Sequence, residues 1–291
     1  MSLNFIRLHF HPRRGVILLL SAALFASIVT STSVASPKKP SPDSVIQAAR
    51  RTAQALALGA PDYIVKRRIY RYRGVRPSWT ITAESIHFWE LLDTTSVSLT
   101  IDHGRETYSN LTVNGFPSDW MPAGISTSGE LFAEPLIVLS SDSAAVLSHP
   151  QSQTLRKHRT YRYDFAVDQS HSTWRVNAAA LPGAVSTASC NPAFSGRIWI
   201  DITTHQTLRI EASSSALPKD FPLEWVDLKT DYDLVTIAGK SYPLPIHAKA
   251  YACKSETEKQ HDLACYWNDS LFTGYGRLTS GGKLHVNPAG Q

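Results

Sequence analysis

The strongest constraint on the fold of this chain is an alternation of apolar and polar side chains that recurs along residues 194–275. A period of two residues sends successive side chains to opposite faces of a β-sheet. The residues that alternate with polar ones in the three clearest runs are Ile198, Ile200 and Ile202, then Leu208 and Ile210, then Val226, Leu228, Thr230, Tyr232 and Leu234. The pattern predicts a large antiparallel sheet with one apolar face and one solvated face.

The rest of the chain adds two helices and further strands. A helix is predicted from Asp43 or Ser44 to about Leu58, and a second one at residues 129–139. Further strands are predicted at residues 63–73, 78–92 (with a break), 96–103, 106–113, 159–167 and 172–178. This order predicts an α+β fold, mostly β: a large curved antiparallel sheet with an N-terminal helix and a central helix packed on one face.

The N-terminal segment indicates export. Three arginines precede an uncharged apolar stretch at residues 15–29, and small residues follow up to Ala35. This order predicts a signal peptide at residues 1–35, cleaved after Ala35. The alternative is a segment that is not cleaved and anchors the protein in the membrane. In either case we expect a periplasmic or secreted protein.

The mature chain is expected to form one domain. Residues 36–42 are rich in Pro, Lys and Ser and predict a short tether. The β-rich domain then extends over residues 43–279, and a flexible tail over residues 280–291. No stretch between residues 61 and 276 has the composition of a linker.

The charge balance argues against a nucleic-acid binder. The whole chain has 29 basic and 24 acidic residues, but residues 1–35 hold three basic residues and no acidic one. Removing them leaves 26 basic and 24 acidic residues, a net charge of +2. Nucleic-acid binding domains normally carry a stronger excess on one face.

The three cysteines predict one disulfide bond. Cys253 ends one alternating run and Cys265 opens the next, with a polar loop between them. Neighbouring residues on adjacent strands come close enough for a disulfide bond if the register agrees. Cys190 is then unpaired, and we interpret it as a half-buried thiol rather than a nucleophile. No zinc ligand spacing is present.

No established catalytic motif occurs in the sequence. A Gly-x-Ser-x-Gly elbow, a His-Glu-x-x-His pair and a phosphate-binding glycine loop are all missing. Asp231 and Asp233 form a pair of carboxylates, but they belong to an alternating polar row beside Lys229 and are interpreted as surface charge. The sequence therefore predicts no catalytic, cofactor-binding or metal-binding residue.

Several motifs together resemble a group of exported bacterial envelope proteins. They occur in order along residues 61–277 and comprise Val113–Pro117, Ser126–Leu131, Ser195–Asp201 with Thr207–Ile210, Leu217–Pro222, Asp231–Val235 and Gly239–Pro245. The sheet expected for this group is similar to that of LolA-like lipoprotein carriers and RseB-like periplasmic sensors. The resemblance implies an open half-barrel with a helix-covered apolar concavity able to hold acyl chains, but it identifies no individual ligand-binding residue.

Two predicted strands combine basic and aromatic residues. This composition suits anionic headgroups or acidic envelope polymers. The candidate residues for an anionic surface are Lys66, Arg68, Tyr70, Tyr72, Arg159 and Arg162. The alternative is two ordinary strands with charged outer faces. Strands that lie together in the fold would favour the binding surface, and separated strands would not.

Three functional hypotheses follow from the sequence. The first is a non-enzymatic exported envelope protein that binds a lipid, a lipoprotein or another apolar ligand in the concavity. Its candidate cavity residues are Ile198, Ile200, Leu228, Tyr232, Leu244 and Ile246. The second is a protein-interaction or sensory module with a filled core and an envelope protein as partner. The third is a hydrolase with a site assembled from scattered residues. The sequence leaves the oligomeric state open.

Overall fold

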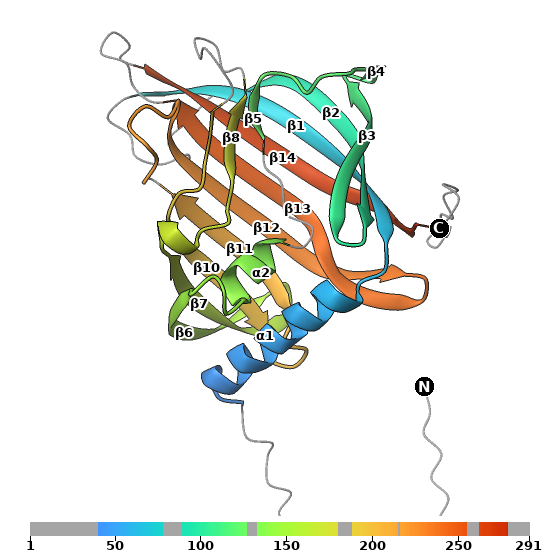
Figure 1. Cartoon of the computed structure of the whole chain (residues 1–291), viewed down its shortest axis with the longest axis vertical. Helices are drawn as coiled ribbons and strands as arrows, with labels where there is room; N and C mark the ends of the chain where they lie inside the picture. Colours follow the sequence, from blue (N-terminus) through green and yellow to red (C-terminus); the bar gives the residue numbers. More distant parts are fainter. Residues whose placement is uncertain are drawn as a thin grey trace, which may run out of the picture. The chain divides into compact units, whose positions relative to one another are not determined.

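The computed structural model describes residues 40–77, 89–126, 133–179, 188–214, 216–254 and 262–278, all within the unit Pro40–Gln291. Its largest element is an 11-stranded antiparallel sheet (Figure 1). In spatial order the strands are β4 (Phe116–Pro117), β3 (Arg105–Val113), β2 (Trp89–Asp102), β1 (Tyr63–Pro77), β14 (Asp262–Arg277), β13 (Lys240–Lys254), β12 (Leu223–Ile237), β11 (Thr207–Ser214), β10 (Phe194–Asp201), β7 (His158–Val167) and β6 (Val146–Leu155). The sheet is not closed, because β4 and β6 form its two edges.

One face of this sheet is covered by a second layer. Figure 1 shows α1 (Pro42–Gly59), α2 (Ala133–Leu139) and strands β5 (Gly124–Ser126) and β8 (Val176–Ala179) in front of the same face. β5, β8 and β9 (Ala188–Cys190) form a small antiparallel sheet of their own. We call the covered side the inner face and the opposite side the outer face. The architecture confirms the predicted α+β class with both helices on one side.

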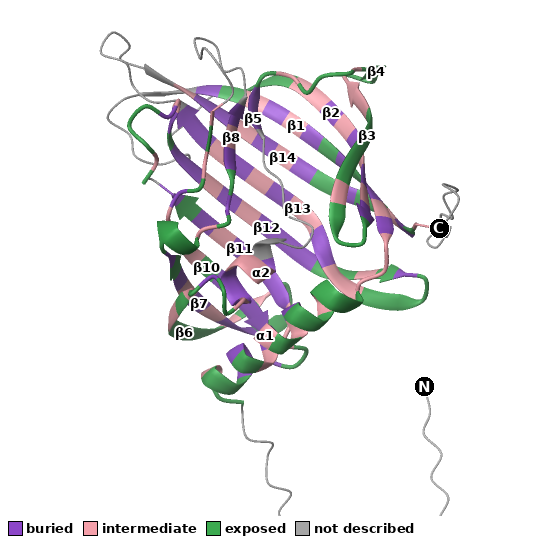
Figure 2. Ribbon diagram, in the orientation of Figure 1, coloured by how far each residue is buried: buried purple, intermediate pink, exposed green. Residues whose placement is uncertain are grey.

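The core lies between the inner face and its covering layer. Buried and less buried residues alternate along the strands (Figure 2), as the two-residue period predicts. Val45 of α1, Val138 of α2 and Val176 of β8 belong to the same buried cluster as Ile198 and Ile200 of β10. The helices and the small sheet therefore supply the second half of the core.

Two tyrosines of β7 hold the beginning of α1 against the sheet. The Tyr161 hydroxyl donates to the Pro40 carbonyl oxygen at 3.1 Å, and the Tyr163 hydroxyl donates to the Pro42 carbonyl oxygen at 2.7 Å. Ser41 caps the helix, because its side chain accepts the Ser44 N–H at 3.2 Å. The helix thus begins one or two residues before the predicted start.

Some predicted elements differ from the structure. Residues 172–178 were expected to form one strand, but the chain makes a 3₁₀ turn at Gln169–His171 and enters β8 only at Val176, in the small sheet. Strand β6 was not predicted, because its sequence is polar and contains Pro150. Parts of two predicted elements, residues 78–88 and 129–132, lie outside the described residues.

Gly196 of β10 is fixed by the close approach of β11. A Cβ atom at this position would lie 1.9 Å from the Glu211 carbonyl oxygen and 2.9 Å from the Ala212 Cα. Both neighbours are backbone atoms of a paired strand, so they cannot move away without breaking the pairing. This glycine of the envelope-protein motif is therefore required by packing.

We expect Gly196→Ala to lower the free energy of unfolding by about 3–5 kcal/mol, because the added methyl group overlaps backbone atoms. Gly59→Ala is the matched control, since nothing lies within 4 Å of its Cβ position. Chemical denaturation of both variants measures the difference. Equal midpoints for the two variants would contradict the packing argument.

Candidate functional site

The predicted cavity residues are buried parts of the core. Ile198, Ile200, Leu228 and Tyr232 belong to the main cluster, and Leu244 to a second cluster around Tyr63 and Leu99. Ile246 is only partly buried, because it lies in a β-bulge. The register shifts there: Asp231 pairs with His247, but Tyr232 pairs with Pro245.

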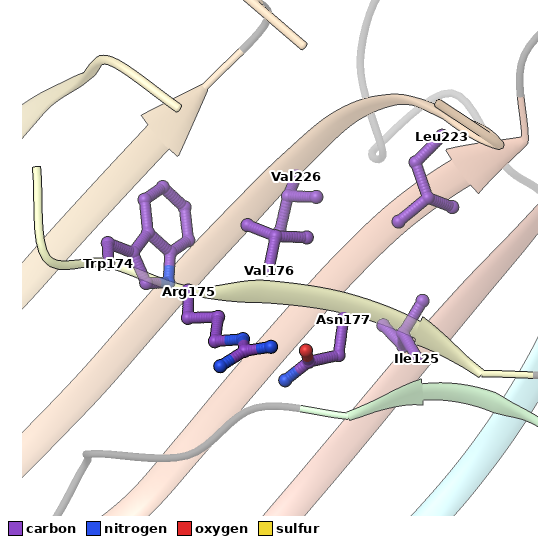
Figure 3. Close-up of a pocket in the computed structure, with 7 residues that line it drawn as sticks. All are labelled: Ile125, Trp174, Arg175, Val176, Asn177, Leu223 and Val226. Atoms are coloured by element: carbon purple, nitrogen blue, oxygen red, sulfur yellow. The ribbon is translucent and has the colours of Figure 1, made fainter. Parts of the chain in front are cut away.

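Within the part of the chain that the structure describes, two small pockets lie between the sheet and its covering layer. One pocket lies beneath β8 and has a volume of about 10 Å³; Figure 3 shows its lining residues, among them Trp174, Val176 and Val226. A second pocket beside α1, lined in part by Ala53 and Tyr232, has a volume of about 20 Å³. Each has room for about one water molecule. Neither can hold an acyl chain.

A buried polar cluster occupies the inner face of β1, β14 and β2. Arg71 forms an ion pair with Asp93 at 3.2 Å and donates to the Ala123 carbonyl oxygen. Asn268 of β14 donates to the Ile125 carbonyl oxygen at 2.9 Å. Burial lowers the Arg71 pKa, and the Asp93 carboxylate opposes this effect. These contacts hold β5 against the large sheet, so the cluster has a structural role.

The two basic strands do not form one surface. The side chains of Lys66, Arg68, Tyr70 and Tyr72 share the outer face of β1, whereas Arg67 and Arg71 point inward and are buried. β7, with Arg159 and Arg162, is separated from β1 by β14, β13, β12, β11 and β10. At about 4.8 Å per strand the separation is roughly 29 Å. The two basic strands therefore do not lie together, as a shared surface for anionic ligands would require.

The outer face of β7, β10, β11 and β12 is a network of ion pairs. Arg209 contacts Asp231 at 2.7 Å, Lys229 contacts Glu211 at 3.4 Å and Arg162 contacts Asp164 at 3.4 Å. The Arg209 guanidinium also lies 5.7 Å from the centre of the Trp199 ring. Asp231 thus faces a cation rather than a second carboxylate. This half of the outer face is electrostatically balanced.

The outer face of β13, β14 and β1 carries aromatic residues instead. Tyr251, Trp267 and Tyr72 are direct cross-strand neighbours. The Trp267 ring stacks on Tyr72 with centroids 4.5 Å apart and on Tyr251 with centroids 5.6 Å apart. Trp89 packs edge-on at 5.7 Å, and the Lys249 ammonium lies 5.1 Å from the Trp267 ring centre. We call Tyr72, Trp89, Tyr251 and Trp267 the aromatic row.

Apolar side chains and a disulfide bond border the aromatic row. Leu91 and Leu271 are 50 % and 39 % exposed, and both pair with outer-face residues of β1. The sulfur atoms of Cys253 and Cys265 are 2.03 Å apart, a disulfide distance, on the pair that the sequence predicts. Packing between stacked rings and a covalent cross-link makes this part of the sheet rigid. The sequence indicates Tyr72 but not its partners, because the β1–β14 register is not visible in it.

Cys190 and the acidic groups offer no reactive centre. Cys190 is half-buried, and burial raises the pKa of its thiol, which keeps it protonated at neutral pH. Asp62, Asp102 and His103 lie close together at an exposed turn. Asp62 accepts the His103 N–H at 2.7 Å, and Asp102 lies 2.6 Å from His103 Nδ1. These contacts hold the β2–β3 turn in place and explain why the three residues lie together.

Asp201, the acidic residue of the envelope-protein motif, closes the β10–β11 turn. Its Oδ1 accepts the N–H groups of Thr203 and Thr204 at 2.7 and 2.8 Å, and its Oδ2 lies 2.8 Å from His158 Nδ1. Burial alone would raise the Asp201 pKa. The hydrogen bonds outweigh burial, so the pKa is lowered.

The comparisons with known proteins leave the family open. No protein-family model and no curated protein matches the chain. Solved structures similar to it include MucB in complex with MucA(peri) and the MucA/MucB complex of Pseudomonas aeruginosa. Both are 8% identical and cover 78% of this chain; the matches span 92% and 93% of those chains, with TM-scores of 0.19 and 0.21. At these scores the likeness carries no argument.

In the described ranges, no helix has the length and apolar character to span a bilayer.

We expect Asp201→Asn to lower the free energy of unfolding at pH 7 by about 1–2 kcal/mol, because a carboxylate acceptor is lost. A lowered pKa means that the stabilisation is present above about pH 4 and is lost as the pH falls through the folded-state pKa. The difference between the two proteins should therefore shrink below about pH 4. Denaturation between about pH 7 and about pH 2.5 tests this, with the exposed Asp220→Asn as control. A constant difference would refute it.

Replacing both Cys253 and Cys265 by Ala should lower the free energy of unfolding by about 3 kcal/mol, because the bond closes a loop in the unfolded chain. Cys190→Ala should cost less than about 1 kcal/mol. Thiol titration of the unfolded, unreduced protein should find one thiol per chain, and three would exclude the disulfide bond.

Proposed function

We propose that this chain is an exported, non-enzymatic interaction module of the cell envelope whose partner docks on the aromatic row. One observation carries the proposal: the helices and small sheet cover the inner face over the main core cluster, whereas the aromatic row stays partly exposed on the outer face. A binding surface must be reachable by its partner. Between the two faces, the outer one meets this requirement.

The composition of the aromatic row suits a protein partner. Tyrosine and tryptophan combine a large apolar area with a polar tip, and they are enriched where proteins meet. Stacking fixes the rings of Tyr72, Trp267 and Tyr251, so little conformational entropy is lost on binding. Leu91 and Leu271 extend the apolar area at its border.

Two cations farther along β1, on the same face as Tyr72, favour an acidic partner. Lys66 and Arg68 lie on the same outer face of β1 and are exposed. Their cross-strand neighbours are uncharged: Thr273 and Ser98 flank Lys66, and Leu271 and Ser96 flank Arg68. The ion-pair network on β10–β12, by contrast, neutralises its own cations. A partner with carboxylates at its rim would complement the β1 side of the surface.

Binding of an apolar ligand in the concavity is the second hypothesis. It requires space between the inner face and the covering layer, and the buried state of Ile198, Ile200 and Leu244 weighs against it. The covering layer would have to move outward as a unit. The ties from Arg71 and Asn268 to β5 oppose such a movement.

Photo-crosslinking in the cell tests the docking surface. A photoreactive amino acid at position 91 or 271 should give one discrete adduct, because both side chains border the aromatic row. The same probe at Ser213, an exposed outer-face residue of β11, is the matched control. Arg68→Glu should reduce the adduct at least fivefold, while Arg197→Glu in the ion-pair network should not (a rim charge is worth about 1 kcal/mol). Equal labelling at positions 213 and 271 would overturn the proposal.

A further inference from the structure

The segment between β4 and β5 exposes three large apolar side chains. Phe116 is 75 %, Trp120 81 % and Met121 47 % exposed. Single exposed apolar residues are common on protein surfaces, but three within six residues form a concentrated apolar feature. We call residues 116–123 the apolar strap.

Both ends of the apolar strap are fixed to the sheet. At its start, Phe116 pairs with Val113, and the Ser118 N–H donates to the Leu111 carbonyl oxygen at 3.0 Å. At its end, the buried Arg71 guanidinium donates to the Ala123 carbonyl oxygen. The exposed rings are therefore presented by a segment held in place, which lowers the entropic cost of burying them.

Ser118 and Trp120 satisfy part of each other's polar groups within the apolar strap. The Ser118 hydroxyl donates to the Trp120 carbonyl oxygen at 2.9 Å and accepts the Trp120 N–H at 3.3 Å. Pro117 and Pro122 have no N–H group. Two of the eight residues of the strap therefore have no backbone donor that would need a partner. Missing and internally bonded N–H groups lower the cost of contact with an apolar medium.

The charge of the residues near the apolar strap indicates which kind of surface the strap can contact. Residues 106–126, which include most of β3, β4, the strap and β5, contain no lysine or arginine, and Asp119 lies on the strap itself. Anionic surfaces would repel this region, whereas a surface of low net charge would not. We propose that the apolar strap inserts Phe116, Trp120 and Met121 into the interface of a lipid bilayer of low surface charge. Aromatic side chains are favoured at this depth because one end is apolar and the other remains wet. This contact is separate from the aromatic row and does not depend on it.

Vesicle flotation tests the insertion. The protein is purified in the form that the cell exports and mixed with phosphatidylcholine vesicles or with vesicles containing equal parts of phosphatidylcholine and phosphatidylglycerol. We expect binding to phosphatidylcholine that high salt does not weaken and that phosphatidylglycerol does not strengthen. The double variant F116A/W120A should bind at least tenfold more weakly, since burial of each ring contributes about tenfold or more.

Val146→Ala is the matched control, because Val146 is 67 % exposed on β6, the opposite edge of the sheet. It should bind like the wild type, and all variants should unfold at similar denaturant concentrations. Equal binding of F116A/W120A and wild type would overturn the proposal. So would binding to anionic vesicles alone, which would assign the contact to Lys66 and Arg68. A wild-type protein that floats with neither kind of vesicle would also overturn it. The remaining explanation would then be that the strap binds in a pocket of another protein.

Discussion

The structure depends above all on the burial of the inner face of the large sheet by the chain's own second layer. Apolar contacts from α1, α2 and β8 supply the main driving force, and a few buried polar ties set the position of that layer. The β7 tyrosines hold the start of α1, while Arg71 and Asn268 hold β5. Removing one partner of such a tie would leave a buried polar group unsatisfied. The inner face is consequently part of the protein core, and its buried polar residues hold the covering layer in position.

The outer face divides into two regions with different physical character. On β7–β12 the charges are balanced by neighbours, as in the contact of Arg209 with Asp231. Exposed pairs of this kind contribute little to stability but leave no net charge to attract a partner. On β13, β14 and β1 the aromatic row dominates, and a contact of His247 with Asp269 separates it from the exposed cations Arg68 and Lys66 farther along β1. This contrast within one face supports interaction through the aromatic row.

Much of the fold follows from local patterns, but the site depends on pairings that one sequence does not reveal. Two-residue alternation identifies β10–β14, and the loop between Cys253 and Cys265 indicates the disulfide pair. Strand β6 was missed because an edge strand can be polar and contain proline. Ile246 was misplaced by a bulge that shifts the register by one residue. The stacking of Tyr72 on Trp267 joins residues almost 200 positions apart.

Native mass spectrometry of the exported protein tests the filled inner face most directly. The protein would be purified from the periplasm without detergent, alongside F116A/W120A to remove any lipid held at the apolar strap. We predict the mass of the polypeptide alone for both proteins, unchanged after incubation with envelope lipids. A stoichiometric acyl-lipid adduct that persists in F116A/W120A would contradict the account. It would show that the covering layer opens and that the concavity binds a ligand.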